Sequence, residues 1–244
     1  MSDALFKSLT IMPSLSKDEW QRLAWPVRWL VMSRASVLVM TFSSCAIGGL
    51  LAYGDGVFNP GLFLLCMAGL LLAHATNNQL NDLTDSLRGI DKGNYFRNRY
   101  GTHVLEDGLL TRQAFIGWII ATGALALAVG AVLVWQRSGI TLHLLAAGAC
   151  LVLFYTWPLK CFGLGEPAVL LAWGPLMVGG TYYVVSASWS WPVTLVSLLY
   201  GLGPTAVLFG KHTDKLDADR ASKVYSLPVI MGERNARRAV MVML

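Results

Sequence analysis

The chain has 244 residues, of which 55% are hydrophobic and only 14% are charged, and its mean hydropathy is +0.54. Soluble domains carry about 25% charged residues, so this composition excludes an ordinary soluble enzyme and a disordered or collagen-like chain. The net charge of +5 comes without a basic stripe interleaved with aromatic residues, so no nucleic-acid partner is expected. The four cysteines show no CxxC spacing and favour core packing over a zinc site or disulfides.

The apolar residues fall into six runs of about 20 residues, the length that a bilayer core of roughly 30 Å requires. A polar segment, residues 1–28, precedes them and shows no features of a cleavable signal peptide. A seventh apolar run opens at Ala239 and reaches Leu244, a rise of only about 9 Å. The sequence therefore predicts an all-α polytopic transmembrane bundle over residues 29–244, with six full spans, the start of a seventh, and an incomplete C-terminus. The predicted spans are Trp29–Tyr53, Pro60–Leu80, Ala114–Gln136, Ile140–Trp157, Glu166–Ala187 and Trp191–Gly210.

The predicted loops alternate sharply in charge. The loops after the first, third and fifth spans contain one basic residue, Arg137, whereas the N-terminal segment and the other loops hold nearly all remaining Lys and Arg. By the positive-inside rule, the N-terminal segment and the basic loops are expected to be cytoplasmic, in a multi-pass protein of the cell's inner membrane. No Asp, Glu, Lys or Arg lies near the centre of spans two to six, which argues against an ion pump and indicates chemistry at the cytoplasmic face.

A first polar cluster extends the second span. Asn78, Asn81, Asp82 and Asp85 stand at i, i+3, i+4 and i+7, which places them on one face of a continued helix. Oxygen ligands of this kind suit Mg²⁺, which proteins hold with a few carboxylates together with substrate phosphates. The alternative is a solvated loop, rich in Asn and Asp, that ends the helix.

A second cluster occupies the equivalent place after the sixth span and contains Lys211, His212, Asp214, Asp217 and Asp219. The two acidic clusters are predicted at the same depth of the membrane, and each is mixed with Lys and Arg. Together they are expected to form a binding site for metal ions and a diphosphate. A lone histidine beside carboxylates favours a hydrogen-bonding role over metal ligation. After the fourth span, Lys160 is suited either to a phosphate or to anchoring the helix at the membrane surface.

At these residues the chain resembles the UbiA-type superfamily of intramembrane prenyltransferases, and within it the dihydroxynaphthoate polyprenyltransferases of menaquinone synthesis. The resemblance covers about residues 27–240. The naphthoate branch favours a first motif of the form N-D-x-x-D-x-x-x-G-x-D. The residues that fit it are Asn81, Asp82, Asp85, Gly89 and Asp91, and Asn78 matches the branch's upstream asparagine.

The second motif departs from the superfamily form D-x-x-x-D. In the superfamily, the later aspartate of this motif lies about seven residues before a Thr-Leu or Ser-Leu pair. Here that pair begins at Ser226, so Asp219 is the later aspartate. Lys215 then stands at the earlier position, and Asp214 is one residue out of register. On an unbroken helix Asp214 and Asp217 share a face and Asp219 turns away from Asp214. We expect Asp214 and Asp219 to be the primary pair, with Asp217 in reserve.

The resemblance implies Mg²⁺-dependent transfer of a polyprenyl group from its diphosphate to an aromatic acceptor, with dihydroxynaphthoate expected. A benzoate, a tetrapyrrole or a glycerol-phosphate lipid as acceptor, and a membrane transporter or scaffold, remain alternatives. The oligomeric state is not predicted. The implied catalytic residues are Asp82, Asp85 and Asp219. The implied residues for binding the diphosphate or the prenyl chain are Arg34, Asn78, Arg88, Tyr155, Lys160 and Lys211. The implied metal ligands are Asn81, Asp85, Asp91, Asp214, Asp217 and Asp219. The aromatic residues considered for a pocket lining, with roles as interfacial anchors equally open, are Tyr155, Trp157, Tyr182 and Tyr183.

Overall fold

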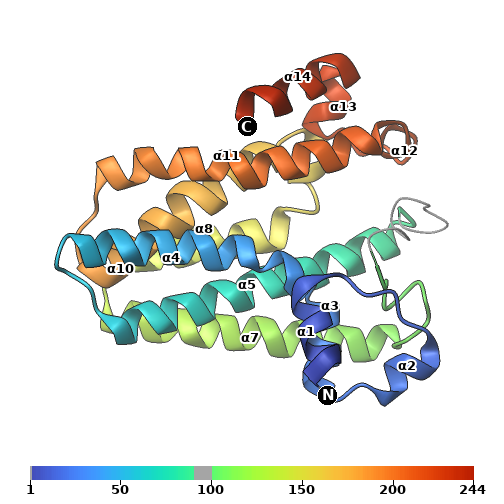
Figure 1. Cartoon of the computed structure of the whole chain (residues 1–244), viewed down its shortest axis with the longest axis horizontal. Coiled ribbons are helices and arrows are strands. Elements are labelled where there is room, and N and C mark those ends of the chain that lie inside the picture. Colours follow the sequence, from blue (N-terminus) through green and yellow to red (C-terminus); the bar gives the residue numbers. More distant parts are fainter. Residues whose placement is uncertain (1, 91–100) are drawn as a thin grey trace.

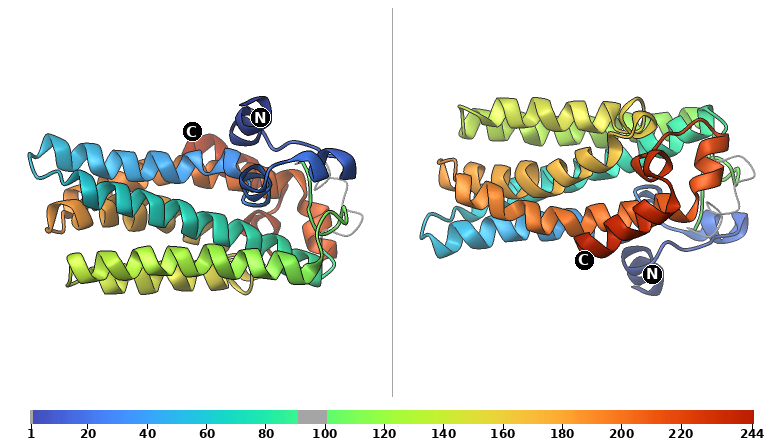
Figure 2. Two further views of the ribbon diagram at one scale, coloured as in Figure 1. Left: turned by 90° about the horizontal axis from the view of Figure 1, so that it is seen from below. Right: turned by 90° about the horizontal axis from the view of Figure 1, so that it is seen from above.

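A computed structural model describes residues 2–90 and 101–244, and every regular element in these residues is a helix (Figure 1). The long helices run along the longest axis of the molecule, and the short helices α1–α3, α12 and α13 gather toward one end (Figure 2). The all-α bundle predicted from the sequence is confirmed. Its helices are α1 (Ser2–Thr10), α2 (Lys17–Arg22), α3 (Trp25–Met32), η1 (Ala35–Val37), α4 (Val39–Gly54), α5 (Pro60–Leu87), α7 (Arg112–Gln136), α8 (Thr141–Phe154), η2 (Leu159–Phe162), α9 (Gly165–Leu171), η3 (Ala172–Gly179), α10 (Gly180–Ser186), α11 (Trp191–Asp214), α12 (Leu216–Ala221), α13 (Leu227–Met231) and α14 (Glu233–Met243).

Five helical stretches of the described chain are long and apolar enough to cross a membrane, and they match five of the six predicted spans. The fourth predicted span corresponds to α8, an apolar helix of 14 residues that rises about 21 Å. The apolar run that opens at Ala239 belongs to α14, which begins at Glu233 and packs on α11 and α13. The five stretches are Ala35–Gly54, Pro60–Leu87, Arg112–Gln136, Gly165–Ser186 and Trp191–Asp214.

The long helices begin at side-chain caps that the sequence supplies. The side chains of Asn59, Thr111 and Ser190 each accept a hydrogen bond from a free backbone N–H of the first turn of α5, α7 and α11. Proline follows the cap of α5 and of α11, where its missing N–H costs no helical hydrogen bond. The turns between spans are therefore encoded locally.

The first predicted span begins later than the hydropathy indicated. The helix around Trp29 is α3, and it ends before Arg34, whose left-handed backbone (φ 51°) separates it from η1 and α4. The membrane-length stretch therefore starts at Ala35, and α3 instead contributes to a cap over one end of the bundle. The buried core of this cap is formed by Trp20, Val31, Met32, Val104, Phe115 and Ile119.

The fifth span is one stretch with a π-helical middle, η3, between α9 and α10. Pro175 lies inside η3, where it removes an N–H and crowds the preceding turn, and a π-type turn accommodates this defect. Such turns re-aim the side chains around them. Trp173 is one of these side chains, and Ser44 on α4 donates a hydrogen bond to its backbone carbonyl at 2.9 Å.

Close packing draws this stretch against both of its neighbours. A Cβ atom added at Gly48 of α4 would lie 2.5 Å from the Val178 carbonyl oxygen, and one added at Gly201 of α11 would lie 2.8 Å from that of Leu170. Small residues at such contacts are typical of membrane helix interfaces, where backbones approach closely. The helices α4, α9–α10 and α11 therefore form one side of the bundle, while α5, α7 and α8 form the other.

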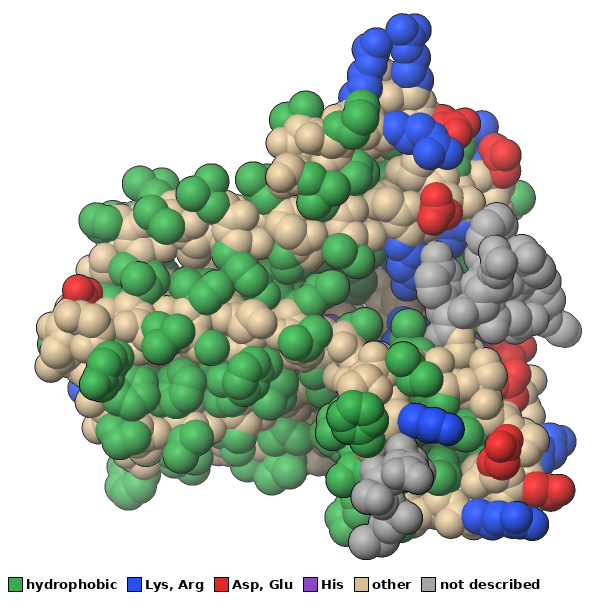
Figure 3. All heavy atoms as spheres, viewed as in Figure 1, with side chains coloured by type: hydrophobic (Ala, Val, Ile, Leu, Met, Phe, Trp, Pro, Cys, Tyr) green, Lys and Arg blue, Asp and Glu red, His purple; other side chains and the backbone are tan. Residues whose placement is uncertain are grey.

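Charged side chains are concentrated at the end of the molecule where α5 and α11 finish, and the flank of the long helices is mostly hydrophobic (Figure 3). The exposed hydrophobic side chains along these helices, such as Leu64, Ile120, Trp135 and Leu199, suit contact with lipid. The apolar helices and this surface identify a membrane protein.

Candidate functional site

A cavity of about 770 Å³ lies inside the bundle between α5, α7, α8, η3 and α11. Its mouth is charged and lies at the end where α5 and α11 finish, and its interior is lined by aliphatic residues of the long helices. The cavity therefore joins a polar compartment to an apolar one. The charged residues that line it are Arg34, Asp85, Lys160, Lys211, Asp214 and Lys215.

The first acidic cluster continues α5 as the spacing predicted. Asp82 and Asp85 are buried on this helix, and each is paired with a cation from another part of the chain. Asp82 pairs with Arg34, and both oxygens of Asp85 accept hydrogen bonds from Lys160 Nζ, at 2.7 and 2.9 Å. Because a buried carboxylate is costly without a partner, these contacts explain how α5 keeps its acidic face inside the protein.

Two asparagines of the same cluster are anchored through their amide nitrogens. Asn78 Nδ2 donates to the Ser33 carbonyl oxygen at 2.9 Å, and Asn81 Nδ2 donates to Thr156 Oγ1 at 3.2 Å. Both side chains line the cavity. The predicted continuation of α5 through the polar motif therefore brings Asn78, Asn81 and Asp85 to one cavity wall.

The second acidic cluster is divided by a break in the helix. α11 ends at Asp214, Lys215 leaves helical geometry (φ −115°, ψ 24°), and α12 begins at Leu216. The break turns Asp219 inward, where it is buried and bonded to Lys215 Nζ at 3.0 Å. Asp217 points to solvent with 98% of its side chain exposed and lies 3.8 Å from Arg220. Asp214 and Asp217 therefore do not share one helical face, as they would on an unbroken helix.

Behind the mouth, a buried carboxylate joins three segments. Glu166 Oε1 lies 2.6 Å from His212 Nδ1 on α11, and its Oε2 accepts a hydrogen bond from the Leu227 N–H at 3.2 Å. His212 lines the cavity and is held by a hydrogen bond, which matches the role favoured from the sequence. This contact fixes the end of α11 against α9 and α13.

The remaining predicted site residues lie in different places. Lys211 lines the cavity, whereas Arg88 is exposed and donates to Cys161 Sγ at 2.8 Å outside it. Asp91 lies outside the described residues. Of the aromatic residues considered, Tyr155 lines the cavity and Trp157 is 56% exposed. The Tyr182 hydroxyl donates a hydrogen bond to the Asp55 carboxylate, and the Tyr183 hydroxyl donates one to the Ser138 carbonyl oxygen. Both contacts lie at the far end of the bundle.

The donors at the mouth fit a hard cation such as Mg²⁺. Asp85, Asn81 and Asp214 present carboxylate and amide oxygens to one cavity, and the buried Oδ2 of Asp219 has no hydrogen-bond partner within the described chain. Residues 2–90 and 101–244 contain no preformed group of three or more acidic, histidine or cysteine side chains for a metal. Mg²⁺ usually binds through one or two carboxylates plus substrate phosphates, so this donor set is compatible with metal that arrives with a phosphorylated ligand.

Sequence reasoning missed several cavity residues, among them His74 and Trp173. His74 could have been found, because it stands three and four residues before Asn77 and Asn78 and so extends the polar stripe of α5. Trp173 carried no such signal beyond its place two residues before Pro175. Its position depends on the π-helical turn of η3.

Taken together, the fold and the cavity define a membrane-embedded helical protein with an internal cavity that is charged at its mouth and apolar inside. The chain belongs to the UbiA prenyltransferase family, whose model matches residues 42–244. This assignment confirms the resemblance noted in the sequence and places the chain in a family of enzymes that transfer prenyl groups. Members of this family are generally dependent on a divalent metal.

Three relatives illustrate the similarity. The chain is 28% identical over 227 residues to a 1,4-dihydroxy-2-naphthoate octaprenyltransferase of Escherichia coli, a match covering 89% of this chain and 73% of the relative. It is 26% identical over 214 residues to a 2-carboxy-1,4-naphthoquinone phytyltransferase of Synechocystis, covering 84% and 66% respectively. It is 26% identical over 194 residues to the human UbiA prenyltransferase domain-containing protein 1, covering 77% and 56%. The chain thus spans between about half and three quarters of these relatives.

Proposed function

We propose that this protein transfers a polyprenyl group from its diphosphate to an aromatic quinone precursor, dihydroxynaphthoate, inside the membrane and with Mg²⁺. The observation that carries the proposal is a cavity whose charged mouth opens onto an apolar interior. A prenyl diphosphate has the same division, with an anionic head and a long hydrocarbon tail. Two of the relatives described above carry names that include a naphthoate or naphthoquinone substrate, which supports the choice of acceptor.

In this proposal the diphosphate binds at the mouth, between the end of α5 and the end of α11. Lys160, Lys211 and Lys215 supply positive charge there, and lysine ammonium groups bind phosphate as flexible point charges. Asp85 and Asp214, with Asn81 and the neighbouring Asp219, would hold Mg²⁺, which neutralises charge on the departing diphosphate.

The substitution itself is a simple exchange at the allylic carbon of the prenyl chain. The bond from this carbon to the diphosphate oxygen breaks, and diphosphate leaves with the electron pair. A carbon of the electron-rich ring forms the new bond to the prenyl chain. That ring carbon then loses its proton, or its carboxylate as CO₂, and the aromatic ring is restored. The aliphatic walls of the cavity would exclude water, the competing nucleophile, from the electron-poor carbon.

The proposal is tested with purified protein in detergent, by measuring release of diphosphate from a polyprenyl diphosphate. We expect release to require both Mg²⁺ and an aromatic acceptor, and to favour dihydroxynaphthoate over 4-hydroxybenzoate when the two compete. Preference for the benzoate or for a glycerol phosphate would contradict the choice of dihydroxynaphthoate as acceptor. A rate of diphosphate release that is the same with and without an acceptor would contradict prenyl transfer. Unchanged behaviour in the presence of a chelator would contradict the role of Mg²⁺.

We also propose that residues 29–244 form the prenyltransferase domain in the inner membrane, with residues 1–28 and both acidic clusters on the cytoplasmic side. The charge of the loops supports this orientation. With the exposed Cys150 replaced by alanine, a cysteine at position 217 should react with an impermeant maleimide only in inside-out vesicles. A cysteine at Gly54, at the opposite end of α4, should show the reverse pattern, and labelling of position 217 in intact cells would contradict the orientation.

A further inference from the structure

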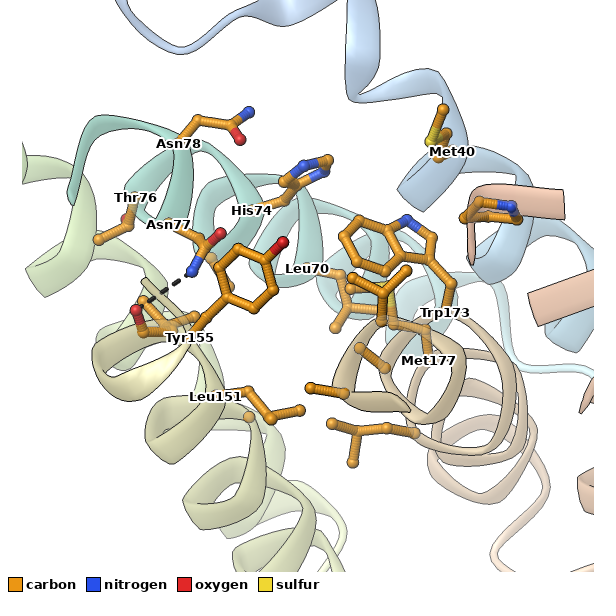
Figure 4. Close-up of a pocket in the computed structure, with 18 of the residues that line it drawn as sticks. Met40, Leu70, His74, Thr76, Asn77, Asn78, Leu151, Tyr155, Trp173 and Met177 are labelled. Carbon is orange, nitrogen blue, oxygen red and sulfur yellow. Dashed lines mark hydrogen bonds between the residues drawn. The ribbon is translucent and has the colours of Figure 1, made fainter. Parts of the chain in front are cut away.

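Between the charged mouth and the aliphatic interior, the cavity wall carries a distinct group of side chains. It consists of His74, Asn77 and Asn78 of α5, Tyr155 at the end of α8, and Trp173 of η3, which we term the aromatic belt (Figure 4). The resemblance implied that Asn78 and Tyr155 bind the prenyl diphosphate, but the proposed binding of diphosphate uses the lysines of the mouth, and an isoprenoid tail does not need these groups. A tail needs only apolar walls, and polar side chains facing hydrocarbon are unfavourable.

Two groups in the belt present hydrogen-bond acceptors to the cavity. Asn77 Nδ2 donates to the Val152 carbonyl oxygen at 3.2 Å and Asn78 Nδ2 to that of Ser33 at 2.9 Å, so each amide is fixed by its nitrogen. The side-chain oxygens of both residues have no hydrogen-bond partner in the described part of the chain. An amide oxygen accepts and cannot donate, so the matching ligand carries O–H or N–H groups.

The rings of the belt are also held in place. His74 Nδ1 lies 2.8 Å from Thr41 Oγ1, and its imidazole meets the Trp173 ring edge to face, with centroids 5.1 Å apart and planes at 84°. The Tyr155 hydroxyl points toward the space beside these two rings (Figure 4). Because the Thr41 contact uses Nδ1, the other imidazole nitrogen of His74 is left for a ligand.

The position of the belt suits one partner of the reaction. Asn78 precedes Asp85 by seven residues on one helix, a rise of about 10 Å, so the belt lies two turns deeper than the carboxylate that faces the diphosphate. A ring bound there would lie beside the first carbons of a prenyl chain whose head group is at the mouth. Aromatic rings favour offset or edge-to-face contacts with other π-systems, and they attract a developing cation.

We propose that the aromatic belt is the subsite for the acceptor, an electron-rich aromatic ring whose hydroxyl groups donate to Asn77 and Asn78. In this subsite, Trp173 contacts the ring, and the Tyr155 hydroxyl and His74 each hydrogen-bond to an oxygen substituent of the ring. The inference rests on the proposed function, because it assigns one of the two substrates of that reaction to a place in the cavity.

The test separates the two substrates kinetically. In Trp173→Leu we expect the KM for dihydroxynaphthoate to rise about 10-fold or more, and in Tyr155→Phe about 3- to 10-fold, the range expected for losing a ring contact or one hydrogen bond. The KM for the prenyl diphosphate should stay within about 2-fold. Trp135→Leu is the matched control, because this tryptophan is 84% exposed on α7, and both KM values should be unchanged. An unchanged acceptor KM in both belt variants would overturn the assignment.

A binding measurement guards against variants that fold poorly or turn over too slowly. The Kd of dihydroxynaphthoate alone is measured by equilibrium dialysis without prenyl diphosphate. It should be about 10-fold larger for Trp173→Phe than for Trp135→Phe. Equal affinity in these two conservative variants would overturn the subsite even if the wild-type protein catalyses transfer. Failure of the proposed function is seen separately, as an absence of acceptor-dependent diphosphate release by the wild-type protein.

Discussion

Replacing Asp85 by asparagine is expected to lower turnover by about 10²- to 10³-fold, the magnitude typical of losing one electrostatic contact to a developing charge. Asp85 is buried at the cavity mouth, and it is the carboxylate to which Lys160 from the α8–α9 connection is bonded. Asparagine preserves its size but removes the negative charge that would bind Mg²⁺. The loss should appear in the rate of acceptor-dependent diphosphate release, and added Mg²⁺ should restore little of it.

Asp217→Asn is the matched control, because it makes the same chemical change in the second acidic cluster. Its side chain is 98% exposed and faces Arg220 rather than the cavity, so turnover should stay within about 2-fold, since exposed ion pairs contribute little. Asp219→Asn, with its buried carboxylate, should resemble Asp85→Asn instead. If Asp217→Asn lost as much activity as Asp85→Asn, the structural division of the cluster would be wrong.

Lys160→Met is expected to destabilise the protein by about 3–5 kcal/mol, the usual cost of leaving a buried charge without its partner. Both side chains of the Lys160–Asp85 pair are almost completely buried, so water cannot replace the lost ammonium group. The freed carboxylate should then bind a cation more readily. We therefore expect Mg²⁺ to raise the Tm of Lys160→Met in detergent more than that of the wild-type protein.

Two comparisons make this prediction specific. Adding Asp85→Asn to Lys160→Met removes the unpaired charge and should restore most of the lost stability, although not activity. Arg220→Met removes a cation from an exposed pair and should change the free energy of unfolding by less than about 0.5 kcal/mol. A Tm for Lys160→Met equal to that of Arg220→Met would show that the buried ion pair does not stabilise this end of the bundle.

The sequence by itself determined the helical membrane architecture and the first acidic cluster. Hydropathy located five long spans, because a bilayer demands about 20 apolar residues from each helix regardless of how the helices pack. The stripe from Asn78 to Asp85 was predicted because its spacing is a property of one continuous helix, α5. Both features depend on interactions between residues close in the chain, which a sequence displays directly.

Tertiary structure alone decided the second cluster and the aromatic lining of the cavity. The helix break at Lys215 turns Asp219 inward and Asp217 outward, and no local residue pattern predicts this break. The partners of Asp82 and Asp85 come from 48 residues before and 75 residues after them. Trp173 reaches the cavity through a π-helical turn packed against α4. In each case, the arrangement is set by contacts between distant segments, which hydrophobic periodicity and local spacing do not encode.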